Sequence, residues 1–199
     1  MSESNPWDYH SDLERDAIIK VAGLIAQGRS DALTRHDEEI GDDGWTLGCR
    51  AFQFARFRIS QAAGTSGYEF LTILDLSKQF IFKIGEVPVR FYRGDADEPS
   101  IRTLRQTFSE LKQLSFVFDA KEEGAGLAYR FAIETDFDGS ITSIKFTGLR
   151  GEKPVFVWDV PYLEAVSLPS AMPESEGVDL PKPKVRVPGA DQQKKSESA

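Results

Sequence analysis

The stretch GYEFLTILDLSKQFIFKIGEVPVRFYRGDADEPSIRTLRQTFSELKQL, residues 67–114, decides the fold. It is the densest apolar segment of the chain. Alternating apolar residues predict three strands, Gly67–Asp75, Gln79–Ile84 and Val87–Tyr92, followed by a helix over Pro99–Leu111. Every third or fourth residue of that helix is apolar, which places these side chains on one stripe. We therefore expect an amphipathic helix packed on one face of a mainly antiparallel sheet.

The turn after Ile84 begins with Gly85, which suits a two-residue hairpin turn that needs a positive φ at its first position. Such a turn fixes the register of the two strands. The expected pairs are Ile84 with Val87, Phe82 with Val89, and Phe80 with Phe91. Because Pro88 has no N–H group to donate, Val87–Tyr92 is expected to be an edge strand near this residue.

Outward from this stretch, the sequence predicts one α+β domain over residues 11–165, with a sheet of seven or eight strands. Residues 1–10 read as a flexible lead, and residues 168–199 as a disordered, proline-rich tail. An N-terminal helix is expected over Asp12–Gln27. It would begin at a capping box formed by Ser11 and Glu14 and end at Gly28.

Five further strands complete the expected sheet. Trp45–Ser60 reads as a long strand with a bulge near Ala55, or as a strand covered on both faces. The other expected strands are Leu114–Asp119, two strands joined by a turn at Asp138 and Gly139, and Val155–Val160. The turn would pair Ile133 with Ile144 and Phe131 with Phe146, with Glu134 diagonal to Lys145.

The composition limits the classes of function. The chain has 199 residues, which is long enough for one domain with a hydrophobic core. Its net charge of −8 argues against general nucleic-acid binding, which depends on excess positive charge. Its single cysteine, Cys49, excludes an internal disulfide and a cysteine-based zinc site. No apolar run approaches the ~20 residues of a membrane span, and the N-terminus lacks a signal sequence, so a cytoplasmic protein is expected.

The charge is unevenly distributed. Residues 1–43 carry four basic and eleven acidic residues, whereas residues 44–105 carry nine basic and six acidic ones. The basic residues of the middle segment are either exposed strand residues paired with neighbouring acids or a basic face that receives an acidic partner. The most acidic stretch, residues 35–44, is either a solvated loop or a cation site, although its spacing does not match a calcium loop.

Catalytic motifs are missing from the sequence. It contains no phosphate-binding loop, no dinucleotide fingerprint and no nucleophile elbow, and its two histidines lie outside the expected sheet. The order of a helix, antiparallel strands, a helix and more strands in a small acidic protein is similar in outline to bacterial secretion chaperones. That resemblance covers topology alone and implies protein binding.

We therefore expect a non-enzymatic, intracellular protein-interaction module, regulatory or chaperone-like, without a cofactor. Its partner, an acidic protein or a second copy of the chain, would bind a basic sheet edge at Arg90, Tyr92 and Arg93.

The alternative is an enzyme, a metal-dependent phosphodiester or nucleotide hydrolase. Its metal ligands would be carboxylates from two loops, Asp95 and Asp97 with Asp136 and Asp138. That activity requires the two loops to converge on one ion.

Overall fold

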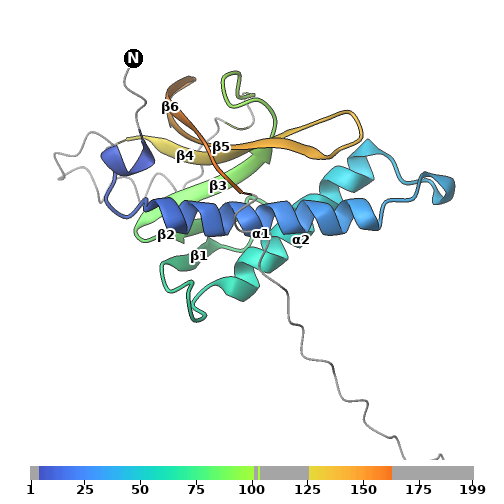
Figure 1. Cartoon of the computed structure of the whole chain (residues 1–199), viewed down its shortest axis with the longest axis horizontal. Helices are drawn as coiled ribbons and strands as arrows, with labels where there is room; N and C mark the ends of the chain where they lie inside the picture. The colour runs from blue at the N-terminus through green and yellow to red at the C-terminus, as the bar shows by residue number, and fades with distance from the viewer. Residues whose placement is uncertain (1–4, 101–102, 104–125, 163–199) are drawn as a thin grey trace, which may run out of the picture. The chain divides into compact units, whose positions relative to one another are not determined.

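The computed structural model describes residues 5–100, 103 and 126–162, which form one α+β arrangement of two helices and a six-stranded mixed sheet (Figure 1). The two α-helices are α1 (Arg15–Thr34) and α2 (Gly44–Ala62), and two short 3-10 helices, η1 (Pro6–Asp8) and η2 (Glu38–Ile40), precede them. The strands, in sheet order, are β1 (Leu71–Asp75), β2 (Ile81–Ile84), β3 (Val87–Arg93), β4 (Ala128–Thr135), β5 (Ile141–Arg150) and β6 (Lys153–Asp159).

The α+β class and the mostly antiparallel pairing are confirmed, with six strands in the described part of the chain instead of seven or eight. The predicted helix after residue 99 falls mostly outside the described residues. The predicted strand Leu114–Asp119 and the tail from residue 168 fall wholly outside them. Neither α1 nor α2 combines the length and the apolar character needed to cross a bilayer.

The β2–β3 hairpin has the expected register, with Ile84 opposite Val87 and Phe82 opposite Val89. The pairing stops there, because Phe80 precedes β2 and has a φ of 35°. The expected edge strand is wrong: β3 lies inside the sheet, antiparallel to β2 and parallel to β4. Pro88 is tolerated because the β3–β4 ladder begins one residue later, at Val89, so its missing N–H breaks no rung.

The β4–β5 hairpin also has the expected register, with Ile133 opposite Ile144 and Phe131 opposite Phe146. A register shift near Thr135 widens the predicted two-residue turn into a loop over residues 136–140. The hairpin therefore projects past the end of the sheet (Figure 1).

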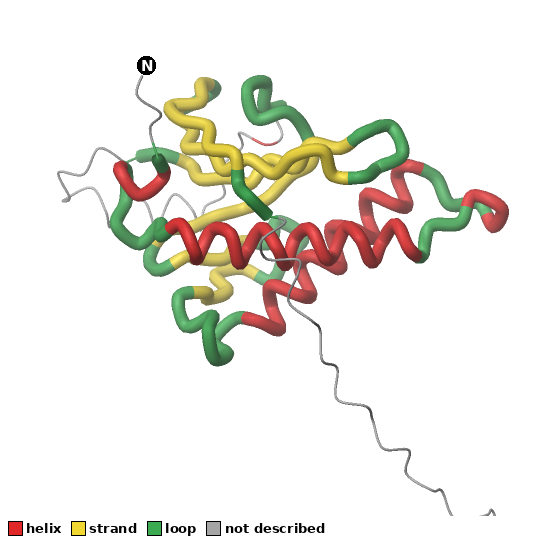
Figure 2. The backbone as a smooth tube through the Cα atoms, viewed as in Figure 1, coloured by secondary structure: helices red, strands yellow, loops and turns green. Residues whose placement is uncertain are grey.

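The core lies between the helices and one face of the sheet (Figure 2). Alternate strand residues point to this face, as the period of a strand requires. They include five phenylalanines, Phe82, Phe91, Phe131, Phe146 and Phe156. Each helix buries one side against them; for example, the rings of Phe52 and Phe91 lie 5.1 Å apart. One core cluster is thus shared by α1, α2 and all six strands.

The predicted strand Trp45–Ser60 is wrong, because these residues form helix α2. Its buried residues recur every four positions, at Leu47, Ala51, Ala55 and Ile59. Asp43 caps the helix by accepting hydrogen bonds from the backbone N–H groups of Trp45 (3.0 Å) and Thr46 (2.8 Å). The Thr46 hydroxyl in turn accepts from the Asp43 N–H at 2.7 Å, which completes a capping box.

Helix α1 begins and ends later than predicted. Glu14 occupies its N-cap, so the capping box at Ser11 is wrong, and the helix continues to Thr34. Gly28 lies in its interior instead of ending it. A Cβ atom at Gly28 would lie only 2.5 Å from the backbone nitrogen of Ala55. The glycine is therefore required by the close approach of α1 to α2, and not by a change of backbone conformation.

Two glycine substitutions in these helices should change stability in opposite directions. Gly28→Ala should lower the free energy of unfolding by about 1–3 kcal/mol, because the new methyl group forces the two backbones apart. A Cβ at Gly48, inside α2, would meet nothing within 4 Å, so Gly48→Ala should raise that free energy by about 0.5–1 kcal/mol. Urea unfolding of the two variants checks this, and equal effects would show that α1 and α2 do not touch at Gly28.

Candidate functional site

The structure does not bring Arg90, Tyr92 and Arg93 onto one surface. Strand alternation places Arg90 and Tyr92 on the face turned away from the core, and Arg93 on the core side, at the end of the strand. The Tyr92 hydroxyl donates to the Asp95 carbonyl at 2.9 Å. Burial, and then the nearby Asp95 charge, raise the pKa of Tyr92 to about 12, so the phenol stays neutral. Among the described strands, the segment from Arg90 to Arg93 is paired on its β4 side only.

Three of the four predicted metal ligands use their carboxylates within the turns in which they lie. Asp95 accepts from the backbone N–H of Asp97 at 2.8 Å, in the loop after β3. Asp136 accepts from the Phe137 N–H at 2.7 Å, and Asp138 accepts from the Ser140 N–H at 2.8 Å. In the described ranges, no three histidine, cysteine or acidic side chains are grouped so that they could hold a metal ion.

The outer face of the sheet carries a polar cluster around Glu134. Its carboxylate accepts from the Ser143 hydroxyl at 2.5 Å and pairs with the Lys145 ammonium at 2.9 Å, the diagonal contact expected from the sequence. Burial opposes ionisation, but the hydrogen bonds from Ser143 and Lys145 outweigh it and hold the pKa of Glu134 below its usual value. A carboxylate that is held ionised by two donors is a poor general base, so the cluster is a structural ion pair.

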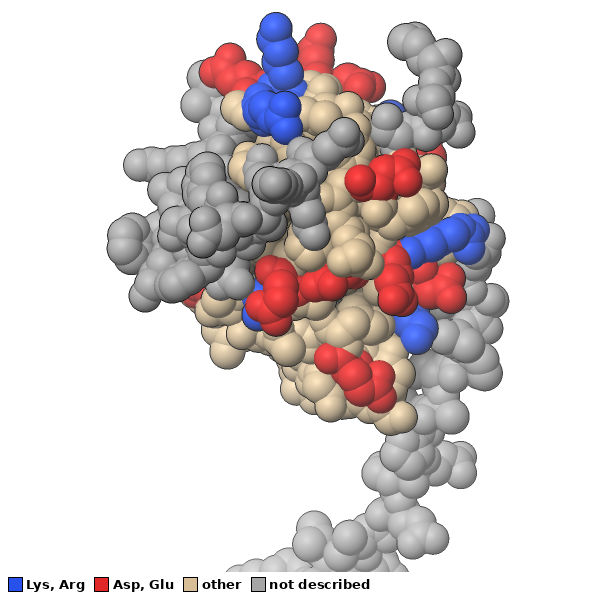
Figure 3. Space-filling model, turned by 90° about the vertical axis from the view of Figure 1, so that its left-hand side faces the viewer, with Lys and Arg blue, Asp and Glu red and all other residues tan. Residues whose placement is uncertain are grey.

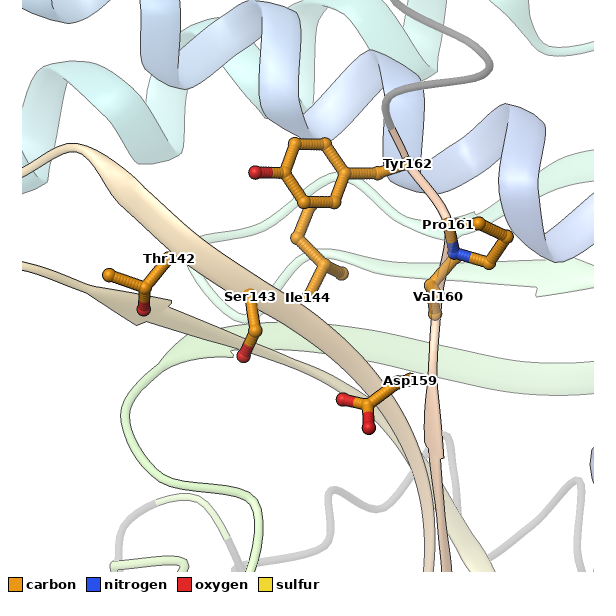
Figure 4. Close-up of a pocket in the computed structure, with 7 residues that line it drawn as sticks. All are labelled: Thr142, Ser143, Ile144, Asp159, Val160, Pro161 and Tyr162. Carbon is orange, nitrogen blue, oxygen red and sulfur yellow. The ribbon is translucent and has the colours of Figure 1, made fainter.

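A depression of about 390 Å³ lies beside this cluster, where the end of β6 separates from β5 (Figure 4). It is lined by Thr142, Ser143, Ile144, Asp159, Val160, Pro161 and Tyr162. Among the described residues of this lining, Asp159 alone is charged. The one hydroxyl with a carboxylate partner, that of Ser143, is bound to Glu134. The lining therefore supplies no nucleophile with a free base beside it.

Three exposed apolar side chains extend from the η2 loop, the start of α2 and the β4–β5 turn. They are Ile40, Trp45 and Phe137, with exposed fractions of 78%, 74% and 97%. We call them the distal surface. The turn and the start of α2 lie side by side, because a Cβ atom at Gly139 would be 2.7 Å from Leu47 (Figure 1). Exposed apolar side chains mark an interaction site where they form one contiguous patch.

A buried arginine of α1, Arg29, holds the β4–β5 turn in place. The Arg29 Nε donates to the Gly139 carbonyl at 2.7 Å and so ties the hairpin turn to α1. Burial and the charge of Arg93 lower the pKa of the Arg29 guanidinium, and the opposite charge of Asp138 partly offsets this. The turn is therefore held in place by a hydrogen bond that water does not reach.

The acidic stretch before α2 is also held in place. Asp42 accepts two hydrogen bonds from the Arg50 guanidinium, at 2.8 and 3.0 Å. Arg50 also donates to the Arg35 carbonyl at 2.7 Å, which ties the end of α1 to α2. Two acids of this stretch thus have structural roles, Asp42 in this ion pair and Asp43 at the cap of α2.

Sequence reasoning missed the distal surface, although Phe137 gave a signal. An aromatic residue between Asp136 and Asp138 has no partner within its own turn, so its exposure follows from the hairpin itself. The opposite side of the molecule, drawn in Figure 3, shows acidic side chains scattered over an uncharged surface, and its visible described lysines and arginines form no continuous patch. Comparisons with protein-family models, curated proteins and solved structures found no match to the chain.

Proposed function

We propose that this chain is a protein-binding module that contacts its partner through the distal surface. The observation that carries the proposal is the exposure of Trp45 and Phe137 on two adjoining, well-anchored elements. Aromatic side chains of this type dominate the binding energy of protein interfaces, because each removes a large apolar area from water on association.

The anchoring of these side chains favours binding. Trp45 follows the Asp43 cap at the start of α2, and Phe137 lies in the turn that Arg29 holds. Elements that are already fixed lose little conformational entropy on association, so more of the contact energy remains as affinity.

A protein-interaction module was expected from the sequence, but through β3. We favour the distal surface because the three candidate residues of β3 are divided between two faces. The described structure supplies no observation in favour of the hydrolase, since three of its four carboxylates, those of Asp95, Asp136 and Asp138, are engaged in their own turns.

Site-specific crosslinking tests the proposal. A photoreactive phenylalanine analogue at position 137 of the full chain should give a discrete protein adduct in the native cell. Unmodified protein should compete the adduct away, whereas the Trp45→Ala variant should need an at least roughly tenfold higher concentration.

Leu76→Ala is the matched control for this experiment. Leu76 is an exposed apolar residue, at 57%, and its carbonyl accepts from Arg56, about 16 Å along α2 from Trp45. This variant should compete as well as the unmodified protein. Equal competition by Trp45→Ala and Leu76→Ala, or no adduct at position 137, would refute the distal surface as the binding site.

A further inference from the structure

The distal surface lies among acidic residues. Residues 35–44 contain five carboxylates and one arginine, and Asp136 and Asp138 flank Phe137 on the other side. The arginine is engaged: Arg35 donates to the Asp31 carbonyl at 3.0 Å and lies over the Phe54 ring. The three apolar side chains are therefore bordered by negative charge on two separate elements.

Two of these carboxylates are held in their ionised form by hydrogen bonds. Hydrogen bonds from Arg50 and from the Asp37 backbone lower the pKa of Asp42, and hydrogen bonds from Ser140 lower that of Asp138. Glu38 and Glu39 are exposed in η2, beside Ile40. The Asp42–Arg50 pair neutralises one charge, and the others remain to act on a partner.

On the basis of the proposed function, we propose that the partner's contact segment is a positively charged polypeptide whose apolar side chains cover the exposed side chains of the distal surface. Lysine or arginine side chains would then approach Glu38, Glu39 and Asp136. Nucleic acids and anionic lipid surfaces are disfavoured here, because both would bring negative charge against these carboxylates. Charge complementarity of this kind sets specificity and association rate, while the aromatic anchors supply affinity.

Peptide selection tests this inference. A display library of random 12-residue peptides is selected on the full chain and counter-selected on Trp45→Ala. The surviving peptides should carry net positive charge together with aromatic or aliphatic residues. A synthetic copy of one of them should bind at least about tenfold more weakly to Glu38→Lys/Glu39→Lys than to the unmodified chain, and should weaken as NaCl rises from ~0.05 to ~0.5 M.

The control is a charge reversal of equal size elsewhere, Asp16→Lys/Glu152→Lys. Asp16 lies in the first turn of α1, and α1 is ~30 Å long. This variant should bind the peptide within about twofold of the unmodified chain. Neutral or acidic Trp45-dependent peptides, or equal loss in both reversals, would overturn the inference and leave the proposed function standing. A selection without Trp45-dependent peptides would overturn both.

Discussion

Phe131→Ala should lower the free energy of unfolding by about 3–5 kcal/mol, the usual cost of truncating a fully buried ring. Phe131 has no exposed surface. Its ring packs edge-on against Phe146, with centroids 4.8 Å apart, and stacks with Phe82 at 6.4 Å. The truncation opens a cavity that the rigid neighbouring rings cannot collapse to fill, which places the expected loss at the upper end of core substitutions.

Phe137→Ala is the control within the same hairpin. Six residues further on, this ring is exposed, so its removal should change the free energy of unfolding by less than about 0.5 kcal/mol. Urea titrations of both variants make the comparison. A loss above about 1 kcal/mol in Phe137→Ala would mean that its ring packs on the domain, and the distal surface would lose one of its three members.

Arg29→Ala should cost about 2–4 kcal/mol of unfolding free energy, because it leaves the buried Gly139 carbonyl without its donor and removes a packed side chain. The loss should extend to binding. Without the hydrogen bond to α1, the turn that carries Phe137 would no longer be held beside α2. The turn would then lose conformational entropy on binding, which lowers the affinity for a partner.

Arg35→Ala is the comparison for this variant. Arg35 is an exposed arginine near the end of the same helix, and its removal should cost less than about 1 kcal/mol. Thermal or urea unfolding separates the two variants. Similar small losses in both would show that the Arg29–Gly139 hydrogen bond does not hold the turn.

The two long hairpins were predictable because their signals are local. Gly85 and Gly139 adopt positive φ values, 58° and 85°, and the register follows from the turn by counting outward. The parallel pairing of β3 with β4 has no local signal. The connection between the two strands runs from residue 94 to 127, and a connection of that length permits either a parallel or an antiparallel pairing.

The two errors in the helices have one origin. Phe52, Phe54, Phe57 and Ile59 suggested a strand, and the fault in their alternation was read as a bulge. The fault was in fact the sign of a helix, whose buried positions Leu47, Ala51, Ala55 and Ile59 are spaced by four. Because no helix is expected over residues 45–60, the sequence offers no element for Gly28 to approach and suggests a helix end there instead.

The candidate site was only partly accessible from sequence. Acidic residues in turns resemble metal ligands because both uses favour aspartate, and only coordinates show that Asp95 and Asp138 bind their own loops. Trp45 and Phe137 are 92 positions apart in the chain, and the elements that carry them adjoin only because Gly139 packs beside Leu47. A contact of that kind is tertiary and leaves no mark in local spacing.

The parallel seam between β3 and β4 has a kinetic consequence. Strands β1–β3 and β4–β6 are each antiparallel meanders of near neighbours, and within the described sheet only this seam joins them. The first pair of the seam, Val89 with Tyr129, closes a loop of about 40 residues. The entropy of closing this loop is lost before the packing of the two meanders can stabilise the contact. We therefore expect each meander to form quickly on its own, and the zipping of the seam to limit the rate at which the chain reaches its native state.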